Sequence, residues 1–308
     1  MTAAGQESVV AVIGLGAMGL PMATRLTERH RVVGFDVSPD RCELAANQGV
    51  QCVRSPGDAM SEASVIVLAV RDQAQLESIL SDDPALASLR PGAIVVLTST
   101  VGPDAARQAS SALAKRAIDM IDAPVSGGAL RAATGELLFM VGASPEVLER
   151  GRWVLEDLAT TIYVAGPSVG DGQIMKVVNQ LLCGIHTAAA GEALNLARAL
   201  GLDLNSVVDV VGKGAGASFM LADRGPRMAQ AFYATPEVRS RMDVISKDMG
   251  IVARVAHAAG VATPVAAAAE HMYRLGLAHG LAAQDDSTIV RVLSPGAGDK
   301  SHPRSMER

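Results

Sequence analysis

One lysine interrupts a nearly uncharged stretch in the second half of the sequence. Lys176 lies near the start of DGQIMKVVNQLLCGIHTAAAGEALNLARALG, residues 171–201, whose apolar residues recur at helical spacing. Asn179 and Gln180 stand three and four residues after Lys176, so the three side chains share one face of the predicted helix. Neither position holds a carboxylate that would form an ordinary surface ion pair. A lysine on such a face needs a partner or a task, and it can take or give the proton of a hydroxyl group.

The same stretch allows structural alternatives. Lys176 could lay its methylenes along an apolar surface and keep its ammonium in water. Cys183 is expected to be a small core residue rather than a nucleophile. His186 projects about 80° away from Lys176 around the helix, so an interface role suits its position as well as contact with a reactant does.

A glycine-rich turn near the amino terminus has the form of a phosphate cradle. A short run of β-branched residues, 8–13, leads directly into it, and the residues that follow have helical spacing. Gly14 permits the tight turn, Gly16 lets the backbone approach a pyrophosphate, and Gly19 allows close helix packing. The residues predicted to bind a dinucleotide are Gly14, Leu15, Gly16, Ala17, Met18 and Gly19.

An acid follows the next predicted strand, residues 31–35, at the spacing that a dinucleotide site requires. Asp36 lies about 20 residues beyond the middle glycine, where a carboxylate would accept hydrogen bonds from the ribose hydroxyls. It would repel a 2′-phosphate, so NAD is favoured over NADP. Arg41 keeps NADP open because it could accommodate that phosphate, and Asp36 could also be a solvated turn residue.

Strand and helix patterns continue to alternate through the first half of the chain. These repeated units predict an α/β fold with a parallel, doubly wound sheet. Ligands in such folds lie beyond the carboxyl ends of the strands, which places Val70 and Thr100 at the edge of the cofactor. Alternatively, residues 98–100 could cap the helix that begins near Pro103. The further predicted strands cover residues 64–70, 93–97, 118–124, 136–141 and 161–164.

A second turn has the composition of an anion site. Ser126, Gly127 and Gly128 follow a late predicted strand, and their successive N–H groups could bind a substrate carboxylate. A plain strand-to-helix turn that uses glycine only for its geometry is the alternative.

Strand patterns stop at residues 166–168, and the rest of the sequence predicts helices. The helix that carries Lys176 should end near Leu200, with Gly201 as its carboxyl cap. Further helices are predicted for residues 205–211, 218–231, 238–259, 264–278 and 285–292. Lys247 and Asp248 could form a surface ion pair or contact the cofactor or active site. We therefore predict a dinucleotide-binding domain at 1–167, an all-helical domain at 168–293, and a disordered tail at 294–308.

Composition excludes several classes of protein. The chain has 308 residues, 49% of them hydrophobic, and a formal net charge of −5, which argues against a general grip on nucleic acid or on anionic membranes. Three cysteines and six histidines show no metal-ligand spacing, so we expect no metal. The first residues lack the basic region of a signal peptide, and a cytoplasmic protein is expected.

Four segments together resemble the β-hydroxyacid dehydrogenase family, which includes 3-hydroxyisobutyrate dehydrogenase. They are GLGAMGLPMA, DAPVSGGALRAATGELLFMVGA, GDGQIMKVVNQLL and ISKDMGIV. The resemblance implies a Rossmann domain, a long connecting helix and an all-α carboxyl-terminal domain, assembled as a homodimer or homotetramer. It further implies that Lys176 is the catalytic acid/base, that Lys247 belongs to a motif near the cofactor, and that substrate contacts come from Ser126, Gly127, Gly128, Asn179 and Gln180.

One departure from the family pattern bears on the substrate. The family commonly has two asparagines after the catalytic lysine, whereas Gln180 here is one methylene longer. The segments KVVNQLLCGIHTAAAGEA, ASFMLADRGPRM and QDDSTIVRV resemble the L-threonate dehydrogenase branch, which implies NAD-dependent oxidation of a small hydroxy or sugar acid. The alternatives are 3-hydroxyisobutyrate dehydrogenase, tartronate semialdehyde (2-hydroxy-3-oxopropionate) reductase and, in a different class, a non-catalytic NAD-binding module.

Overall fold

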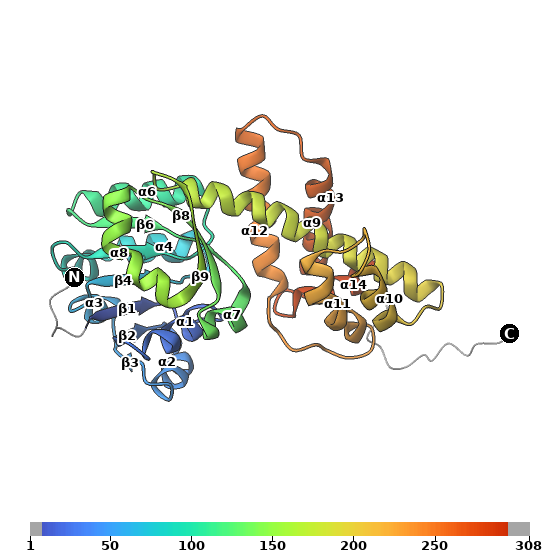
Figure 1. Cartoon of the computed structure of the whole chain (residues 1–308), viewed down its shortest axis with the longest axis horizontal. Coiled ribbons are helices and arrows are strands. Elements are labelled where there is room, and N and C mark those ends of the chain that lie inside the picture. Colours follow the sequence, from blue (N-terminus) through green and yellow to red (C-terminus); the bar gives the residue numbers. More distant parts are fainter. Residues whose placement is uncertain (1–7, 295–308) are drawn as a thin grey trace. The chain divides into compact units, whose positions relative to one another are not determined.

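The computed structural model describes residues 8–294, which divide into two compact units between Lys176 and Val177. The first unit is an α/β domain built on one sheet, with strand order β3-β2-β1-β4-β5-β6-β8-β7 and with β9 paired to β8 (Figure 1). Its strands are β1 Val9–Ile13, β2 Arg31–Phe35, β3 Gln51–Cys52, β4 Val65–Leu68, β5 Ile94–Leu97, β6 Asp119–Asp122, β7 Val125–Ser126, β8 Leu137–Gly142 and β9 Ala159–Gly166. Its helices are α1 Gly19–Leu26, α2 Pro39–Ala46, α3 Pro56–Met60, α4 Gln73–Leu80, α5 Asp83–Ala87, α6 Pro103–Ala114, α7 Gly128–Thr134 and α8 Pro145–Leu158.

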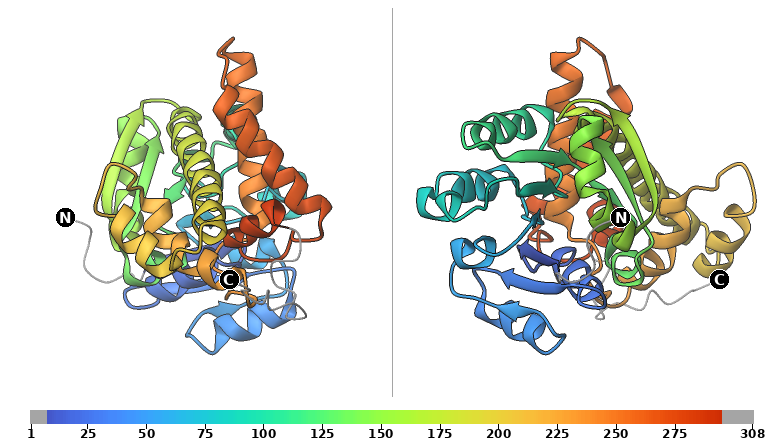
Figure 2. Two further views of the ribbon diagram at one scale, coloured as in Figure 1. Left: turned by 90° about the vertical axis from the view of Figure 1, so that its right-hand side faces the viewer. Right: turned by 60° about the vertical axis from the view of Figure 1, so that its left-hand side comes forward.

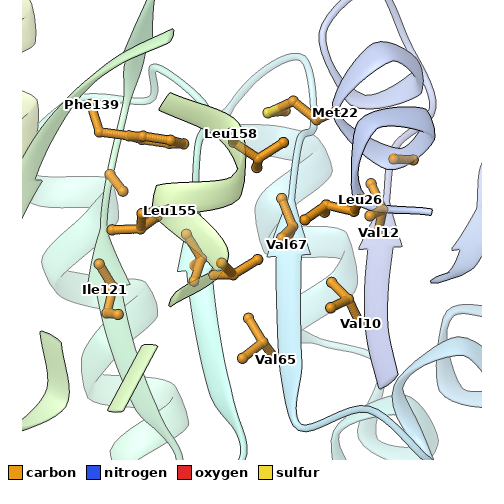
Figure 3. Close-up of a cluster of buried hydrophobic side chains, with 14 of the residues drawn as sticks. Val10, Val12, Met22, Leu26, Val65, Val67, Ile121, Phe139, Leu155 and Leu158 are labelled. Atoms are coloured by element: carbon orange, nitrogen blue, oxygen red, sulfur yellow. The ribbon is translucent and has the colours of Figure 1, made fainter. Parts of the chain in front are cut away.

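The sheet buries side chains on both faces, as the continuous apolar runs of its strands predict. Because successive side chains of a strand point to opposite faces, Val10 and Val12 join one core while Ala11 and Ile13 join the other. Helices α1 and α8 cover the first face, and α3 to α6 cover the second. Figure 3 shows the first core, in which the labelled residues are Val10, Val12, Met22, Leu26, Val65, Val67, Ile121, Phe139, Leu155 and Leu158.

The last part of the sheet departs from the predicted parallel arrangement. Strands β3, β2, β1, β4, β5 and β6 are parallel, as predicted, but β8 runs antiparallel to β6. Residues 125–126, predicted to be part of a turn, form the short strand β7, which pairs with β8. The chain between β6 and β8 is occupied by β7 and by the seven-residue α7. It is then too short for the crossover that would bring β8 back to run parallel to β6.

Helix α9, Asp171–Ala199, crosses the division between the units and matches its predicted start. The second unit is helical, as predicted, and comprises α10 Leu204–Val211, α11 Phe219–Ala231, α12 Met242–Ala258, α13 Pro264–Ala278, the 3-10 helix η1 Asp286–Ile289 and α14 Val290–Leu293. Helices α12 and α13 run side by side (Figures 1 and 2). The predicted start of α12 at residue 238 was wrong, because the N–H groups of Arg239 and Ser240 donate instead to the Asp285 carboxylate.

Buried ion pairs tie α11 to η1 within the helical unit. Arg224 Nη2 lies 3.1 Å from Asp286 Oδ2, and Arg227 Nε lies 3.1 Å from Asp285 Oδ1. Both aspartates are almost completely buried. Asp223 contacts both arginines, so the five charges form one network rather than isolated pairs.

Two sequence predictions concern the ends and the environment of the chain. Most of the predicted disordered tail, residues 295–308, lies outside the described residues, while Ser294 donates its hydroxyl to Asn195 Oδ1. Within residues 8–294, no helix is long and apolar enough to cross a membrane. The cytoplasmic location stays a prediction.

Candidate active site

The glycine-rich turn joins β1 to α1 and leaves room where a pyrophosphate would approach. Gly14 has φ +92°, and a Cβ there would lie 2.6 Å from the Ala69 carbonyl oxygen, so this position requires glycine. At Gly16, no heavy atom of the described residues beyond its chain neighbours lies within 4 Å of such a Cβ. The folded chain itself would thus tolerate a side chain at Gly16, whereas a bound pyrophosphate would not, and the turn fits a dinucleotide.

The other residues of this turn have different surroundings. Leu15 is fully buried and Ala17 is exposed. Met18 is the N-cap residue of α1, which begins at Gly19. The amino end of α1 therefore follows directly on the turn, and its N–H groups are the predicted phosphate donors.

Asp36 stands at the carboxyl end of β2 and faces the glycine-rich turn. Its Oδ2 accepts a hydrogen bond from the Leu15 N–H at 2.7 Å, and its Oδ1 accepts one from the Ser38 N–H at 2.8 Å. Arg41 donates from Nη1 to the Leu15 carbonyl oxygen at 3.2 Å. An acid and an arginine thus both border the turn. Asp36 favours NAD, whereas Arg41 favours NADP.

The carboxyl ends of β4 and β5 contribute polar and apolar groups to the same edge of the sheet. Val70 follows β4 and is buried. The hydroxyls of Thr98 and Ser99 donate to the Leu68 carbonyl oxygen at 3.0 and 3.3 Å. The alternative in which residues 98–100 cap α6 was wrong, because the N-cap residue is Gly102. Thr100 lies between these hydroxyls and α6, beyond the end of β5, where the cofactor edge was predicted.

The turn predicted to bind a carboxylate has a backbone that only glycine adopts readily. Gly127 has φ +134° and Gly128 has φ +74°, both in the left-handed region. Ser126 ends β7, and Gly128 begins α7. The turn is therefore a sharp change from strand to helix, and its geometry alone accounts for both glycines. Its use as an anion site stays a prediction.

Lys176 lies in the second turn of α9 and is 7% exposed. This burial contradicts the alternative in which its ammonium extends into bulk water. The polar face of the helix is the buried one, since Gln173 and Gln180 are 0% and 7% exposed while Val178 is 55% exposed. A polar face that is buried in preference to an apolar one is typical of a functional surface rather than of an ordinary core helix.

Gln180 contacts Asp248, the acid of the Lys247-Asp248 pair of α12, within the helical unit. Its Nε2 donates to Asp248 Oδ2 at 2.5 Å, and its Oε1 accepts from Asn179 Nδ2 at 2.8 Å. Lys247 Nζ lies 3.0 Å from Asp248 Oδ1. Asp248 is only 5% exposed, so the alternative of a solvated surface ion pair was wrong.

Cys183 packs against the core but is only half-buried, and His186 keeps both of its alternatives. The Cys183 sulfur lies 3.7 Å from the Met220 sulfur at the edge of the apolar core of the helical unit. His186 is half-buried, which suits an interface as well as a site.

Asp122 and Gln173 form a buried polar pair that was not predicted from the sequence. Asp122 ends β6 and Gln173 lies in the first turn of α9, and both are 0% exposed. A signal existed, because an acid at the end of the buried strand pattern IDMID needs a partner. The partner could not be identified, since 51 residues separate the two side chains.

A doubly wound sheet with this turn, an acid after β2 and a buried lysine at the end of the first unit is typical of a nicotinamide-dependent oxidoreductase. Residues 9–166 match the family model described as the NAD binding domain of 6-phosphogluconate dehydrogenase. Residues 170–293 match the one described as NAD-binding of NADP-dependent 3-hydroxyisobutyrate dehydrogenase.

Individual proteins of this kind match most of the chain. L-threonate dehydrogenase of Cupriavidus necator is 35% identical over 92% of this chain and 95% of its own. NAD-dependent L-serine dehydrogenase of Pseudomonas aeruginosa is 33% identical over 94% and 99%. A crystal structure of 3-hydroxyisobutyrate dehydrogenase from Salmonella typhimurium superposes with a TM-score of 0.86 at 32% identity, covering 93% of this chain and 100% of that one. The chain belongs to the β-hydroxyacid dehydrogenase family, related to 3-hydroxyisobutyrate dehydrogenase, and is an NAD(P)-dependent 3-hydroxyacid dehydrogenase.

Proposed function

We propose that this enzyme uses NAD to oxidise a hydroxyl of a small hydroxy or sugar acid, with L-threonate as the favoured substrate. The observation that carries the proposal is the burial of Lys176 on a helix that begins directly after the dinucleotide-binding fold. Burying a lysine side chain costs free energy, so a buried lysine indicates an electrostatic interaction or a role in catalysis.

The proposed reaction separates a hydride from a proton. The turn of Ser126, Gly127 and Gly128 binds the substrate carboxylate and presents the hydroxyl to Lys176. Neutral Lys176 Nζ takes the hydroxyl proton, and a carbonyl remains on the substrate. Nicotinamide, when bound, would accept the hydride from the substrate carbon that carries this hydroxyl. Gln180 and Asn179 would contact the substrate on the same helix face as Lys176.

The preference for NAD rests on Asp36. Its carboxylate borders the glycine-rich turn at 2.7 Å from the Leu15 nitrogen, where a 2′-phosphate would bring further negative charge. Arg41 contacts the same residue of the turn and supports NADP as the second candidate. Lys247, Val70 and Thr100 are further proposed cofactor contacts.

The preference for L-threonate rests on the relatives of that name and on Gln180, whose amide is held inside the helical unit. 3-Hydroxyisobutyrate and tartronate semialdehyde are second candidates. The relative named as an L-serine dehydrogenase adds L-serine to them.

A panel of small acids tests the proposal. L-threonate, D-erythronate, 3-hydroxyisobutyrate, glycerate, tartrate and L-serine would each be assayed with NAD and with NADP by absorbance of the reduced nicotinamide. L-threonate with NAD should give the highest kcat/KM. Turnover of another acid at a higher kcat/KM would replace the substrate, and absence of turnover across the panel would favour a non-catalytic NAD-binding module.

Replacement of the lysine tests the mechanism. Lys176→Ala should lower kcat by about two to four decades while NAD binding is retained. Lys213→Ala is the matched control, because Lys213 is exposed and pairs with the exposed Asp209 of α10. Near-normal turnover of Lys176→Ala would remove this residue from the proposed chemistry.

We also propose that the protein assembles as a homodimer or homotetramer. Large apolar side chains of the helical unit are more than half exposed in the single chain, as at Leu196, Val210 and Phe219. Light scattering after size-exclusion chromatography would give the mass, and a mass of one chain would contradict the proposal.

A further inference from the structure

Asp122 receives two backbone hydrogen bonds from the start of α9. Its Oδ2 accepts from the N–H of Gly170 at 2.9 Å and from the N–H of Gln173 at 3.0 Å. The first N–H groups of a helix have no partner within the helix, and an acid normally satisfies them from the N-cap position. Here a residue from the end of β6, far away in the sequence, does so. The strand end and the helix start are thereby held in one register.

The carboxamide of Gln173 extends this contact to a second loop. Its Nε2 donates to Asp122 Oδ1 at 2.8 Å and to the Ser99 carbonyl oxygen at 3.0 Å. Its Oε1 accepts from the N–H groups of Val101 and Gly102, both at 3.0 Å. These four contacts use both donors and both acceptor lone pairs of a primary amide. The loop between β5 and α6 is therefore joined to the first turn of α9.

Backbone packing leaves this turn little freedom to move. A Cβ at Gly172 would lie 2.4 Å from the Met140 carbonyl oxygen and 2.9 Å from that of Asp122. The helix thus begins in direct contact with the backbone of β8 and β6. A shift of the helix start toward the sheet would produce clashes, and a shift away from it would break the hydrogen bonds of Asp122.

Three predicted parts of the active site lie within a few residues of this network along the chain. Lys176 follows Gln173 by three residues, on the same face of α9. Ser126 follows Asp122 by four residues. Thr100 lies between Ser99 and Val101, whose backbone groups both bond to Gln173. An apolar pair would fill the same space without the cost of burying a carboxylate. The hydrogen bonds of Asp122 and Gln173 are directional, and they therefore fix the relative positions of the segments that they join.

We propose that Asp122 and Gln173 are positioning residues that fix Lys176 relative to the substrate turn and the loop of Thr100. Proton transfer depends on placement, and a displacement of about 1 Å can cost roughly a hundredfold in rate. The inference rests on the proposed role of Lys176 as acid/base. Neither Asp122 nor Gln173 needs to touch the substrate for this purpose.

Paired substitutions separate positioning from simple support of the fold. Asp122→Asn and Gln173→Met would each be made in the wild-type chain and in Lys176→Ala, and assayed with the best substrate of the panel. Asp119→Asn is the matched control, because Asp119 begins the same strand but is only half-buried and pairs with Arg150. Circular dichroism and the affinity for NAD would be measured for every variant.

In the wild-type background, each substitution should lower kcat by about ten- to a hundredfold. NAD affinity should change by less than about twofold, and Asp119→Asn should leave both quantities unchanged. In the Lys176→Ala background, the same substitutions should lower the residual kcat by less than about twofold, because no lysine remains to be placed.

Two other results would overturn the inference in distinguishable ways. An equal loss in both backgrounds would mean that the pair supports the fold and not Lys176, and the proposed function would stand. Near-normal turnover of Lys176→Ala would remove the proposed function and the inference together. If Asp122→Asn does not fold, Gln173→Met alone decides, because it leaves the two backbone bonds of Asp122 in place.

Discussion

Gln180 Nε2 donates a hydrogen bond to Asp248 Oδ2 over 2.5 Å, although 68 residues separate the two in the sequence. An ionised carboxylate only accepts hydrogen bonds, so the nitrogen of the amide must face Asp248 and its oxygen must face Asn179. The longer side chain at position 180 is therefore what spans the distance between α9 and α12.

We expect Gln180→Asn to alter substrate selection more than turnover. The shorter amide loses Asp248, and kcat/KM for L-threonate should fall about tenfold or more through KM. 3-Hydroxyisobutyrate lacks the additional hydroxyls of threonate and should be affected less. Steady-state kinetics with both acids would measure this, with Gln230→Asn on the exposed side of α11 as control. An equal loss for both acids would exclude Gln180 from substrate selection.

Asp36→Ala should shift the cofactor preference. It removes the acceptor that would bind the ribose hydroxyls and the charge that opposes a 2′-phosphate. We expect kcat/KM with NAD to fall by about ten- to a hundredfold and the ratio of NADP to NAD activity to rise. Asp40→Asn, an exposed change in the first turn of the neighbouring helix α2, serves as control. An unchanged ratio would show that the preference is set elsewhere.

Burial of Asp122 should make stability depend on pH. Burial raises the pKa of its carboxyl from 3.8 to about 6, against the N–H donors of Gln173 and Gly170, and the nearby charge of Asp171 adds to the rise. The folded state then holds its proton at pH values where the unfolded state has released it. The free energy of unfolding should therefore fall as pH rises from about 4 to about 6, by roughly 3 kcal/mol, and then level off.

Comparison with Asp122→Asn isolates this effect from the other titrating groups. Urea unfolding of both proteins between pH 4 and 7 would give the difference in stability. That difference should move against the wild-type chain as pH rises, because only the wild type acquires the buried charge. A pH-independent difference would contradict the raised pKa.

The ion pairs between α11 and η1 should be sensitive to the loss of one partner. Asp286→Ala removes one of the two carboxylates that pair with the largely buried guanidinium of Arg224 and leaves it with the more exposed Asp223, which should cost about 2–3 kcal/mol of stability. Asp209→Ala breaks an exposed pair with Lys213 and should cost less than about 1 kcal/mol. Denaturant unfolding of both variants would measure the two losses, and similar values would show that burial adds nothing to the Arg224 pair.

Local sequence determined the parts of this protein whose signals are short. Short sequence patterns predicted the glycine turn, Asp36 and the apolar strands. A tight turn, a helix start or a strand buried on both faces is determined by a few neighbouring residues. Lys176 was recognisable for the same reason, since helical spacing alone places it beside two amides.

Tertiary structure decided what depends on side chains that meet from distant parts of the chain. Asp122 with Gln173 and Gln180 with Asp248 are each more than 50 residues apart. The antiparallel orientation of β8 relative to β6 and the burial of the polar face of α9 likewise depend on how the elements pack against one another. Hydrogen bonds and burial reward proximity in space, and periodicity in the sequence reports only proximity along one element.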